Sequence, residues 1–303
     1  RRNVFINGAF DVAQRGVGPT TGISGYSTVD RWIIPLSGQT TQQVANDRVS
    51  YPSKMLKVTA DSSNGYGIIR QMVENPATLS EGYATLSFWA KTSTANDFRV
   101  EFQQLFGSGG SSTVSIIDDA DYWKVPNDEW NFYSITVYLP SILGKTVGTG
   151  SPGLSVLFGP TSGQPGGNIV YYSEVQLEAG KVATPFEHRS YGEELALCQR
   201  YFERYYPAAQ TQVYNESSVA NHKWIRIRHT QTMRTSPALS GHSGIVNKSA
   251  GALGTITGIT RQSGTVNVVS IRVAFNASQG TSNAIYHFDP IPAVAYLDFD
   301  AEV

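Results

Sequence analysis

The chain has 303 residues, of which 40% are hydrophobic, 11% aromatic and 16% charged, and its formal net charge is −1. This composition supports sizeable cores and excludes a disordered chain. The near-neutral charge lacks the basic excess of nucleic-acid-binding domains, and no apolar run approaches the roughly 18 residues of a membrane span. We therefore expect no nucleic acid partner and no membrane insertion.

From the N-terminus to about residue 180, short apolar or alternating segments separated by Gly, Pro and Asn turns predict β-strands. In the clearest of them, Arg99, Glu101 and Gln103 alternate with apolar residues, as in a strand with one buried face. Strands at this spacing indicate a β-sandwich or jelly roll. We predict strands at 4–6, 54–60, 67–73, 84–91, 98–106, 129–139, 154–158 and 169–178.

One helix is predicted near residues 191–205, where Ser190 and Glu193 match a capping box. Apolar residues repeat at helical spacing after it: Leu195, Cys198, Phe202 and Tyr205. Alternating β-pattern then returns, ending in a last strand at 296–303. The expected fold class is all-β, with a jelly-roll β-sandwich over 1–189, a linking helix over 190–206 and a small β-domain over 207–303.

A carbohydrate groove needs flat apolar faces for the C–H surface of a sugar and planar polar groups for its hydroxyls. Aromatic and polar side chains of the predicted sandwich would supply both. Core packing is the alternative for Trp89, and loop anchoring beside Asp30 and Arg31 is the alternative for Trp32. The predicted sugar contacts are Trp32, Gln71, Trp89, Arg99, Glu101, Gln103, Tyr122 and Trp123.

Candidate catalytic residues are sparse in the sequence. Asp118, Asp119 and Asp121 form the densest acidic cluster, which suits calcium or, as the alternative, a solvated loop. The five histidines are scattered, and neither a zinc-hydrolase motif nor a nucleophile elbow occurs. We therefore predict no catalytic residues and no required cofactor. A glycoside hydrolase that uses two carboxylates is the enzymatic alternative.

Several motifs follow one another in a fixed order. Asn7–Gly16 and Asp30-Arg31-Trp32 precede the LSFWAK segment at 86–91, and Val175-Gln176-Leu177-Glu178 precedes 183–187 and the helix segment 193–202. In this order they resemble the C-terminal region of bacteriophage tail-fibre and related virion proteins. The resemblance implies a non-enzymatic protein of the virion, assembled in the host cytoplasm, that binds host surface polysaccharide or other virion proteins. We predict a homotrimer. The alternatives to the binding function are a polysaccharide depolymerase of a tail fibre and a purely structural capsid or tail protein with no sugar affinity.

The N-terminal segment also resembles the jelly-roll carbohydrate-binding modules of polysaccharide-degrading enzymes. In such modules the first and last strands lie near each other, often around a structural calcium. The resemblance implies that residues 4–6 and 171–178 are neighbours and that Asn7, Glu174 and Glu178 are calcium ligands. Ser173-Glu174 stands where these modules commonly have paired aspartates, a departure from the calcium pattern.

Overall fold

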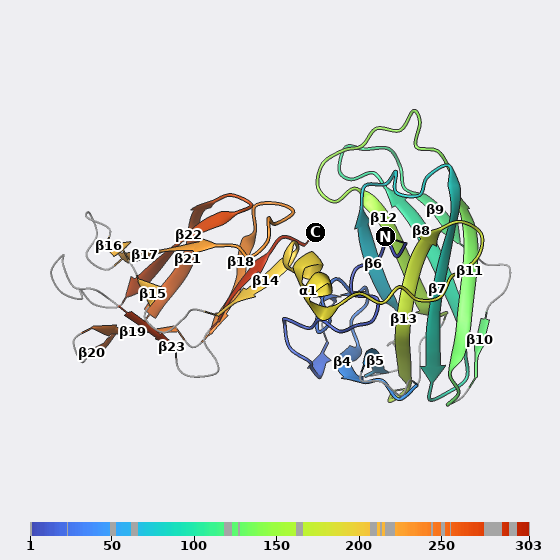
Figure 1. Cartoon of the computed structure of the whole chain (residues 1–303), viewed down its shortest axis with the longest axis horizontal. Coiled ribbons are helices and arrows are strands. Elements are labelled where there is room, and N and C mark those ends of the chain that lie inside the picture. The colour runs from blue at the N-terminus through green and yellow to red at the C-terminus, as the bar shows by residue number, and fades with distance from the viewer. Residues whose placement is uncertain are drawn as a thin grey trace. The chain divides into compact units, whose positions relative to one another are not determined.

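A computed structural model of the chain is shown in Figure 1. It divides into two compact units, Arg1–Leu195 and Ala196–Glu302, hereafter unit 1 and unit 2. No helix in the described part of the chain is long and apolar enough to cross a membrane. The structure describes residues 2–22, 24–48, 53–61, 66–117, 123–126, 128–161, 166–206, 211–212, 214–215, 222–243, 245–249, 252–254, 256–275, 287–290 and 296–302.

Unit 1 is the predicted jelly-roll β-sandwich, made of two antiparallel sheets whose inner faces share one core (Figure 1). Sheet A has the order β1 (Thr20–Thr21), β4 (Gln39–Ala45), β5 (Lys54–Ala60), β13 (Ile169–Ala179), β7 (Gly82–Thr92) and β11 (Asn131–Leu139). Sheet B has the order β10 (Trp123–Val125), β8 (Asn96–Leu105), β12 (Gly153–Pro160), β6 (Ile69–Glu74), β3 (Ile33–Ile34) and β2 (Gly25–Tyr26), with β9 (Val114–Ile117) also paired to β8.

The long strands send alternate residues into the core, because successive side chains of a strand point to opposite faces. In β8, Phe98, Val100 and Phe102 are fully buried, while Arg99, Glu101 and Gln103 lie on the outer face of sheet B, which confirms the predicted alternation. In β7 the ring of Phe88 lies in the core, and the next residue, Trp89, lies on the outer face of sheet A.

The first residues of the chain lie against β13, the last strand of the sandwich. The Val4 amide donates to the Leu177 carbonyl (2.7 Å), and the Val175 amide donates to the Gly8 carbonyl (2.9 Å). A Cβ atom at Gly8 would stand 2.1 Å from the Val175 carbonyl oxygen, so only glycine permits this approach. The predicted adjacency of the two ends of the sandwich is confirmed.

Apart from the backbone hydrogen bond of Val4, side chains hold the stretch at residues 4–6, where the sequence predicts a strand. The Gln71 amide accepts from the Ile6 N–H (2.8 Å) and donates to the Ile6 carbonyl (2.9 Å). Asn3 donates to the Val175 carbonyl (3.1 Å) and accepts from the Leu177 amide (3.0 Å). Residues 5–7 are therefore bent and form no strand, which corrects that prediction.

The Asn7 and Asp30-Arg31-Trp32 motifs build one buried cluster. The Asn7 side chain donates to the carbonyls of Val12 (2.8 Å) and Asp30 (2.9 Å) and accepts from the Val12 amide (3.0 Å). The Trp32 indole N–H donates to the Asn7 carbonyl (2.8 Å), and Trp32 is only 2% exposed. These residues stabilise the N-terminal loops on the sandwich.

The buried carboxylate of Asp30 makes the stability of unit 1 depend on pH. It accepts from the amide (3.1 Å) and side chain (2.5 Å) of Gln14, and Arg15 lies 3.7 Å away. Burial raises the pKa of Asp30 from 3.8 to about 6, although Arg15 opposes this shift. Because the folded-state pKa is the higher one, the stabilisation is complete below pH 3.8 and is lost as the pH rises through about 6.

We expect Asp30→Asn to remove this pH dependence. The free energy of unfolding of the variant, relative to that of the unsubstituted protein, should increase by about 3 kcal/mol between pH 3.5 and pH 7.5. Urea unfolding followed by circular dichroism at several pH values measures this difference between the two proteins. The contributions of the other titrating groups are the same in both proteins and cancel in the difference. A difference that stays constant with pH would show that Asp30 does not carry the effect.

Unit 2 is built from short antiparallel strands with a second core. Beside that core, the Glu203 carboxylate accepts from His229 Nδ1 (2.7 Å), and both side chains are buried. The described strands form three sheets: β14 (Phe202–Tyr205), β24 (Tyr296–Asp300) and β18 (Ala238–Ser243); β15 (Thr211–Gln212), β23 (His287–Pro290), β19 (Ile245–Ser249) and β20 (Ala252–Gly254); and β16 (Tyr214–Asn215), β17 (His222–Arg228), β22 (Val268–Phe275) and β21 (Ile256–Gly264).

The helix α1 (Tyr191–Gln199) is shorter than predicted. Its capping box is present, because the Ser190 amide donates to Glu193 (3.1 Å) and the Glu193 amide donates to the Ser190 hydroxyl (3.3 Å). The predicted helix end near residue 205 is wrong, since β14 begins at Phe202 and pairs with β24. Pairing with a distant strand overrides the local helical spacing of the apolar residues.

Candidate functional site

The structure separates the predicted sugar contacts into three regions. Trp32 and Gln71 are 2% and 1% exposed and bond to the N-terminal backbone, so neither offers a surface to a ligand. Arg99, Glu101 and Gln103 share the outer face of sheet B. Trp89 lies on the outer face of sheet A. Trp123 begins β10, opposite Phe98, while Tyr122 and the acidic cluster Asp118, Asp119 and Asp121 lie outside the described residues.

A pocket of about 590 Å³ lies on the outer face of sheet A around Trp89. We call it the Trp89 pocket. Its walls come from β7, β11, β13, the residues that follow β4, and the segment 183–188. They combine aromatic rings with hydrogen-bonding side chains: Arg48, Ser87, Trp89, Phe132, Glu174, Ala183, Thr184, Pro185, Phe186 and His188.

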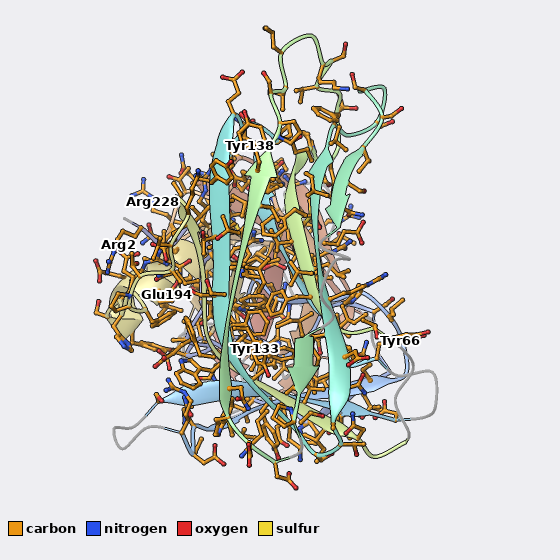
Figure 2. All side chains as sticks on the ribbon, turned by 90° about the vertical axis from the view of Figure 1, so that its right-hand side faces the viewer. Arg2, Tyr66, Tyr133, Tyr138, Glu194 and Arg228 are labelled. Atoms are coloured by element: carbon orange, nitrogen blue, oxygen red, sulfur yellow. The ribbon has the colours of Figure 1, made fainter. Side chains whose placement is uncertain are left out.

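Strand register places the aromatic wall of the Trp89 pocket. Phe132 of β11 and Ser173 of β13 lie on either side of Trp89, so all three share the outer face. The Phe132 and Trp89 ring centroids are 5.4 Å apart, and Phe132 is 48% exposed. Figure 2 shows β11 with Tyr133 and, near its other end, Tyr138. Phe132 therefore presents an open aromatic face beside Trp89.

A β-bulge brings a carboxylate into the same pocket. The pairing of β13 with β7 shifts between Ser173 and Gln176, and Glu174 within the bulge has φ of 51°. A bulge inserts residues that break the alternation and re-aims their side chains. Val175 is thereby buried in the core, while Glu174 lines the pocket.

Arg48 links the carboxylate to the aromatic wall. Its guanidinium carbon lies 4.4 Å from the centroid of the Trp89 ring, and its Nη2 forms an ion pair with Glu174. This is a cation–π contact combined with a charge pair, a geometry that the planar guanidinium group favours. The pocket therefore has a hydrogen-bonding edge whose two formal charges cancel.

The preceding residues attach Arg48 to sheet A. Asn46 donates to the Ser173 hydroxyl (2.8 Å), and Asp47 accepts from Lys91 Nζ (2.7 Å) and from the Trp130 indole (2.9 Å). Burial acts to raise the pKa of Asp47, but these two hydrogen bonds outweigh it and hold the pKa below its ordinary value. The residues that follow β4 are thus fixed at three successive positions.

The wall of the pocket formed by the segment 183–188 is held by Gln176 and Glu178, from the motif at 175–178. Glu178 accepts from the amide (2.8 Å) and the hydroxyl (2.7 Å) of Thr184, and Gln176 donates to Glu178 (2.9 Å). The Gln176 side chain also accepts from the Glu187 amide (2.8 Å). Gln176 and Glu178 therefore hold the segment 183–187 over the outer face of sheet A.

The three predicted calcium ligands have separate roles in the described structure. Asn7 bonds to the N-terminal loops, Glu174 pairs with Arg48, and Glu178 bonds to Thr184. No group of three or more acidic, histidine or cysteine side chains suited to a metal occurs among the described residues. Calcium binding through Asn7, Glu174 and Glu178 stays a prediction.

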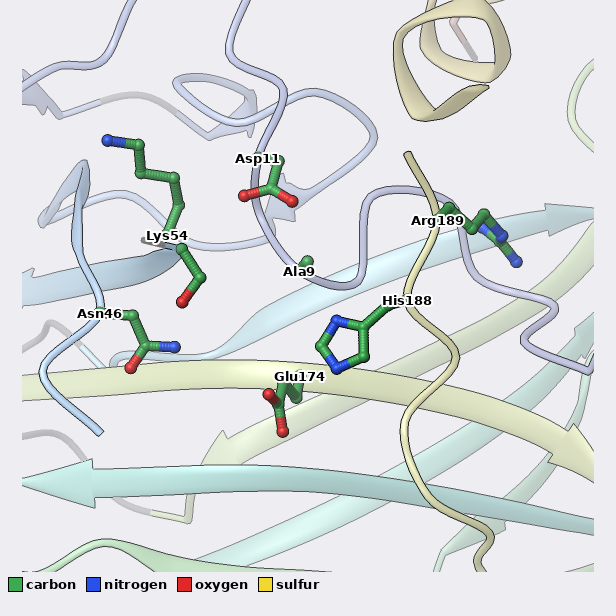
Figure 3. Close-up of a pocket in the computed structure, with 8 residues that line it drawn as sticks. Ala9, Asp11, Asn46, Lys54, Glu174, His188 and Arg189 are labelled. Carbon is green, nitrogen blue, oxygen red and sulfur yellow. The ribbon is translucent and has the colours of Figure 1, made fainter. Parts of the chain in front are cut away.

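A smaller pocket of about 190 Å³ adjoins the Trp89 pocket and shares Glu174 and His188 with it. Figure 3 shows Glu174 on β13 beneath the His188 ring, with Asp11 and Lys54 on the opposite side. Burial, with a contribution from Glu194, raises the pKa of Asp11. The smaller pocket thus forms a polar extension of the Trp89 pocket.

Sequence patterns predicted Trp89 but missed Arg48, Phe132, Phe186 and His188. Only Phe132 had a usable signal. In β11, Ile135 and Val137 point into the core and the residues between them point outward. The same alternation, extended toward the start of the strand, places Phe132 on the outer face. The other three residues lie in loops whose course the strand pattern does not determine.

Comparison with known proteins gives structural similarity alone. No family model and no curated protein matches the chain. A CBM22-1 xylan-binding domain from Paenibacillus barcinonensis is 14% identical, with 53% of this chain and 91% of that chain covered and a TM-score of 0.36. A C-terminal family 22 carbohydrate binding module of Clostridium thermocellum is 15% identical over 48% and 89% of the two chains, with a TM-score of 0.32.

A family 30 carbohydrate binding module is 11% identical over 55% of this chain and 92% of that chain, with a TM-score of 0.34. These structural neighbours are therefore carbohydrate-binding modules. Identities and TM-scores of this size transfer no ligand to the present chain.

Proposed function

We propose that unit 1 binds a carbohydrate in the Trp89 pocket without breaking a bond. The observation that carries the proposal is the pocket itself, in which aromatic faces lie beside an arginine–glutamate pair over the outer face of sheet A. Its volume of about 590 Å³ lies within the range of small-molecule sites. Sheet residues, rather than loops alone, position the ligand.

The chemistry of the pocket matches that of a neutral sugar. Phe132 and Phe186 provide apolar faces for the C–H side of a sugar ring. Arg48 donates and Glu174 accepts hydrogen bonds, so together they can hold adjacent hydroxyls. Because the charges of this pair cancel, the pocket itself gives no preference for a charged ligand.

Binding, rather than hydrolysis, is the function that this site supports. Glycosidases commonly use two carboxyl groups on either side of the scissile bond. Among the described residues that line the Trp89 pocket, Glu174 is the carboxylate, and it pairs with Arg48. A glycosidase mechanism would need a second carboxyl group across this pocket.

We further propose that the chain belongs to a phage virion, as a fibre or decoration protein that contacts host surface polysaccharide or other virion components. The order of the sequence motifs, from Asn7 to the segment 193–202, supports this wider role. We propose a homotrimer located in the virion. Weak single contacts repeated on three copies would then gain from effective concentration.

A matched pair of variants tests the sugar site. Phe132→Ala removes the open aromatic face of the pocket, whereas Tyr138→Ala removes another exposed aromatic of β11, 52% exposed and paired with Tyr83 instead of Trp89 (Figure 2). We expect Phe132→Ala to weaken binding of neutral glycans by about tenfold, equivalent to about 1.4 kcal/mol, and Tyr138→Ala to leave it unchanged. A glycan array followed by calorimetry with the best ligand measures both.

Three results would overturn parts of the proposal. Equal binding by the Phe132→Ala and Tyr138→Ala variants would exclude the Trp89 pocket. A blank array together with binding to capsid or tail proteins would favour a purely structural part. New reducing ends on incubation with a polysaccharide would show that the chain is a depolymerase.

A further inference from the structure

The outer face of sheet B carries a row of side chains that includes an arginine without a charged partner. Ile33 of β3 pairs with Tyr26 on one side and with Arg70 on the other. Arg70 lies opposite Leu157 of β12, which in turn lies opposite Glu101 of β8. Because directly opposite residues share a face, all five lie in one row across the sheet.

Further arginines surround the Tyr26 end of this row. The guanidinium carbons of Arg15 and Arg31 lie 5.7 Å and 5.9 Å from the centroid of the Tyr26 ring. Arg31 also donates to the Met72 carbonyl (2.7 Å), which fixes it beside β6. Arg70 therefore lies on the same side of the sheet as two further arginines, of which Arg15 is paired with Asp30.

The charge on Arg70 is not compensated by the described residues. Its Nε atom is shielded from solvent and has no hydrogen-bond partner among them, and no ion pair joins Arg70 to any of them. Burial lowers the pKa of Arg70, with Tyr26 acting in the opposite direction. A partly desolvated cation of this kind costs stability unless an anion approaches it.

Neighbouring groups on the same face are also short of partners. Within the described part of unit 1, the Nε atom of Arg99 and the fully buried hydroxyl of Ser155 form no hydrogen bond. Ser155 lies between Met72 and Gln103 in the strand register. Gln103 donates to Glu101 (2.7 Å), which leaves its amide oxygen as an acceptor for a ligand hydroxyl.

We propose that this face of sheet B is a second binding site, which takes an acidic polysaccharide and pairs its sulfate or carboxylate groups with Arg70 and Arg99. Arginine is suited to both groups through its planar fork of donors. Gln103 would bind a hydroxyl of the same polymer. The site lies on a different sheet from the Trp89 pocket and does not depend on it.

A polysaccharide fits this face better than a nucleic acid does. Glu101 lies in the same row as Arg70 and would repel a uniformly charged phosphodiester chain. The whole chain has a formal net charge of −1, which gives no general attraction for polyanions. Hydroxyl-binding groups beside two arginines suit a polymer whose charges are spaced between neutral sugar units.

The test compares polymers and variants of the full chain. Dextran sulfate, polygalacturonate and uncharged dextran separate sulfate, carboxylate and backbone contributions, and a single-stranded DNA tests the nucleic acid alternative. Arg70→Gln removes the central charge. Arg228→Gln, at an exposed position of unit 2, is the control because it changes the net charge by the same amount.

We expect dextran sulfate or polygalacturonate to bind in low salt and uncharged dextran not to bind. Arg70→Gln should weaken that binding by about tenfold, whereas Arg228→Gln should change it less than twofold. Equal losses in the two variants, failure of both acidic polymers to bind, or tighter binding of DNA would each overturn the proposal.

Thermal unfolding without ligand distinguishes a binding role from a structural one. If Arg70 awaits an external anion, Arg70→Gln leaves the unfolding midpoint unchanged or raises it, because a desolvated charge is removed. A lowered midpoint would show that Arg70 serves the fold. The result is independent of the neutral-glycan test on Phe132, so either proposal can fail alone.

Discussion

Replacing Trp32 by alanine is expected to lower the free energy of unfolding by about 4 kcal/mol, the range of buried aromatic truncations. The side chain is 2% exposed and packs against Phe5, Phe10 and Phe158, with ring centroids 5.6, 5.1 and 6.1 Å away. The variant also loses the hydrogen bond to the Asn7 carbonyl. It thus leaves both a cavity and an unpaired buried acceptor.

Urea unfolding followed by circular dichroism measures this loss. Leu143→Ala is the control, because Leu143 is 90% exposed and its truncation should change stability by less than about 0.5 kcal/mol. If Trp32→Ala lowers the free energy of unfolding no more than Leu143→Ala does, Trp32 is not a core residue. The prediction that Trp32 contacts a sugar would then stand again.

Replacing Arg189 by methionine is expected to lower the free energy of unfolding by about 3 kcal/mol, as when one partner of a buried ion pair is removed. Arg189 donates to the carbonyls of Asn3 and Phe5 and pairs with Glu194 (3.2 Å), whose side chain is 8% exposed. Without Arg189, the Glu194 carboxylate keeps its hydrogen bond from the Asn7 amide but loses its counter-charge.

A second substitution separates the charge from the packing. Glu194→Gln removes the uncompensated carboxylate, so the double variant should recover part of the stability that Arg189→Met alone loses. Additive losses in the two single variants would mean that the pair is not coupled.

Much of unit 1 could be predicted from the sequence because its long strands bury one face each. The predicted segments 54–60, 84–91 and 169–178 correspond to β5, β7 and β13. Strict alternation in β8 correctly placed Arg99 on the outer face. In such strands the hydrophobic pattern and the register agree, so local sequence reports the face of each residue.

The site could be predicted only in part, because it depends on contacts between distant segments. Trp32 and Trp89 both carry an indole, but only the partners of Trp32 in the N-terminal loops place it in the core. The bulge at Glu174 and the course of the residues around Arg48 break the strand pattern, so neither could be placed from the sequence. The separation of Trp89 from Arg99 follows from strand order, which local alternation does not determine.

The indole resonances of the protein give the most direct test of sugar binding in the Trp89 pocket. In a ¹H–¹⁵N spectrum, titration with the neutral oligosaccharide that binds best on the array should shift the Trp89 indole signal. The buried Trp32 indole, bonded to the Asn7 carbonyl, should stay in place. A bound oligosaccharide that leaves the Trp89 signal unchanged would contradict the account.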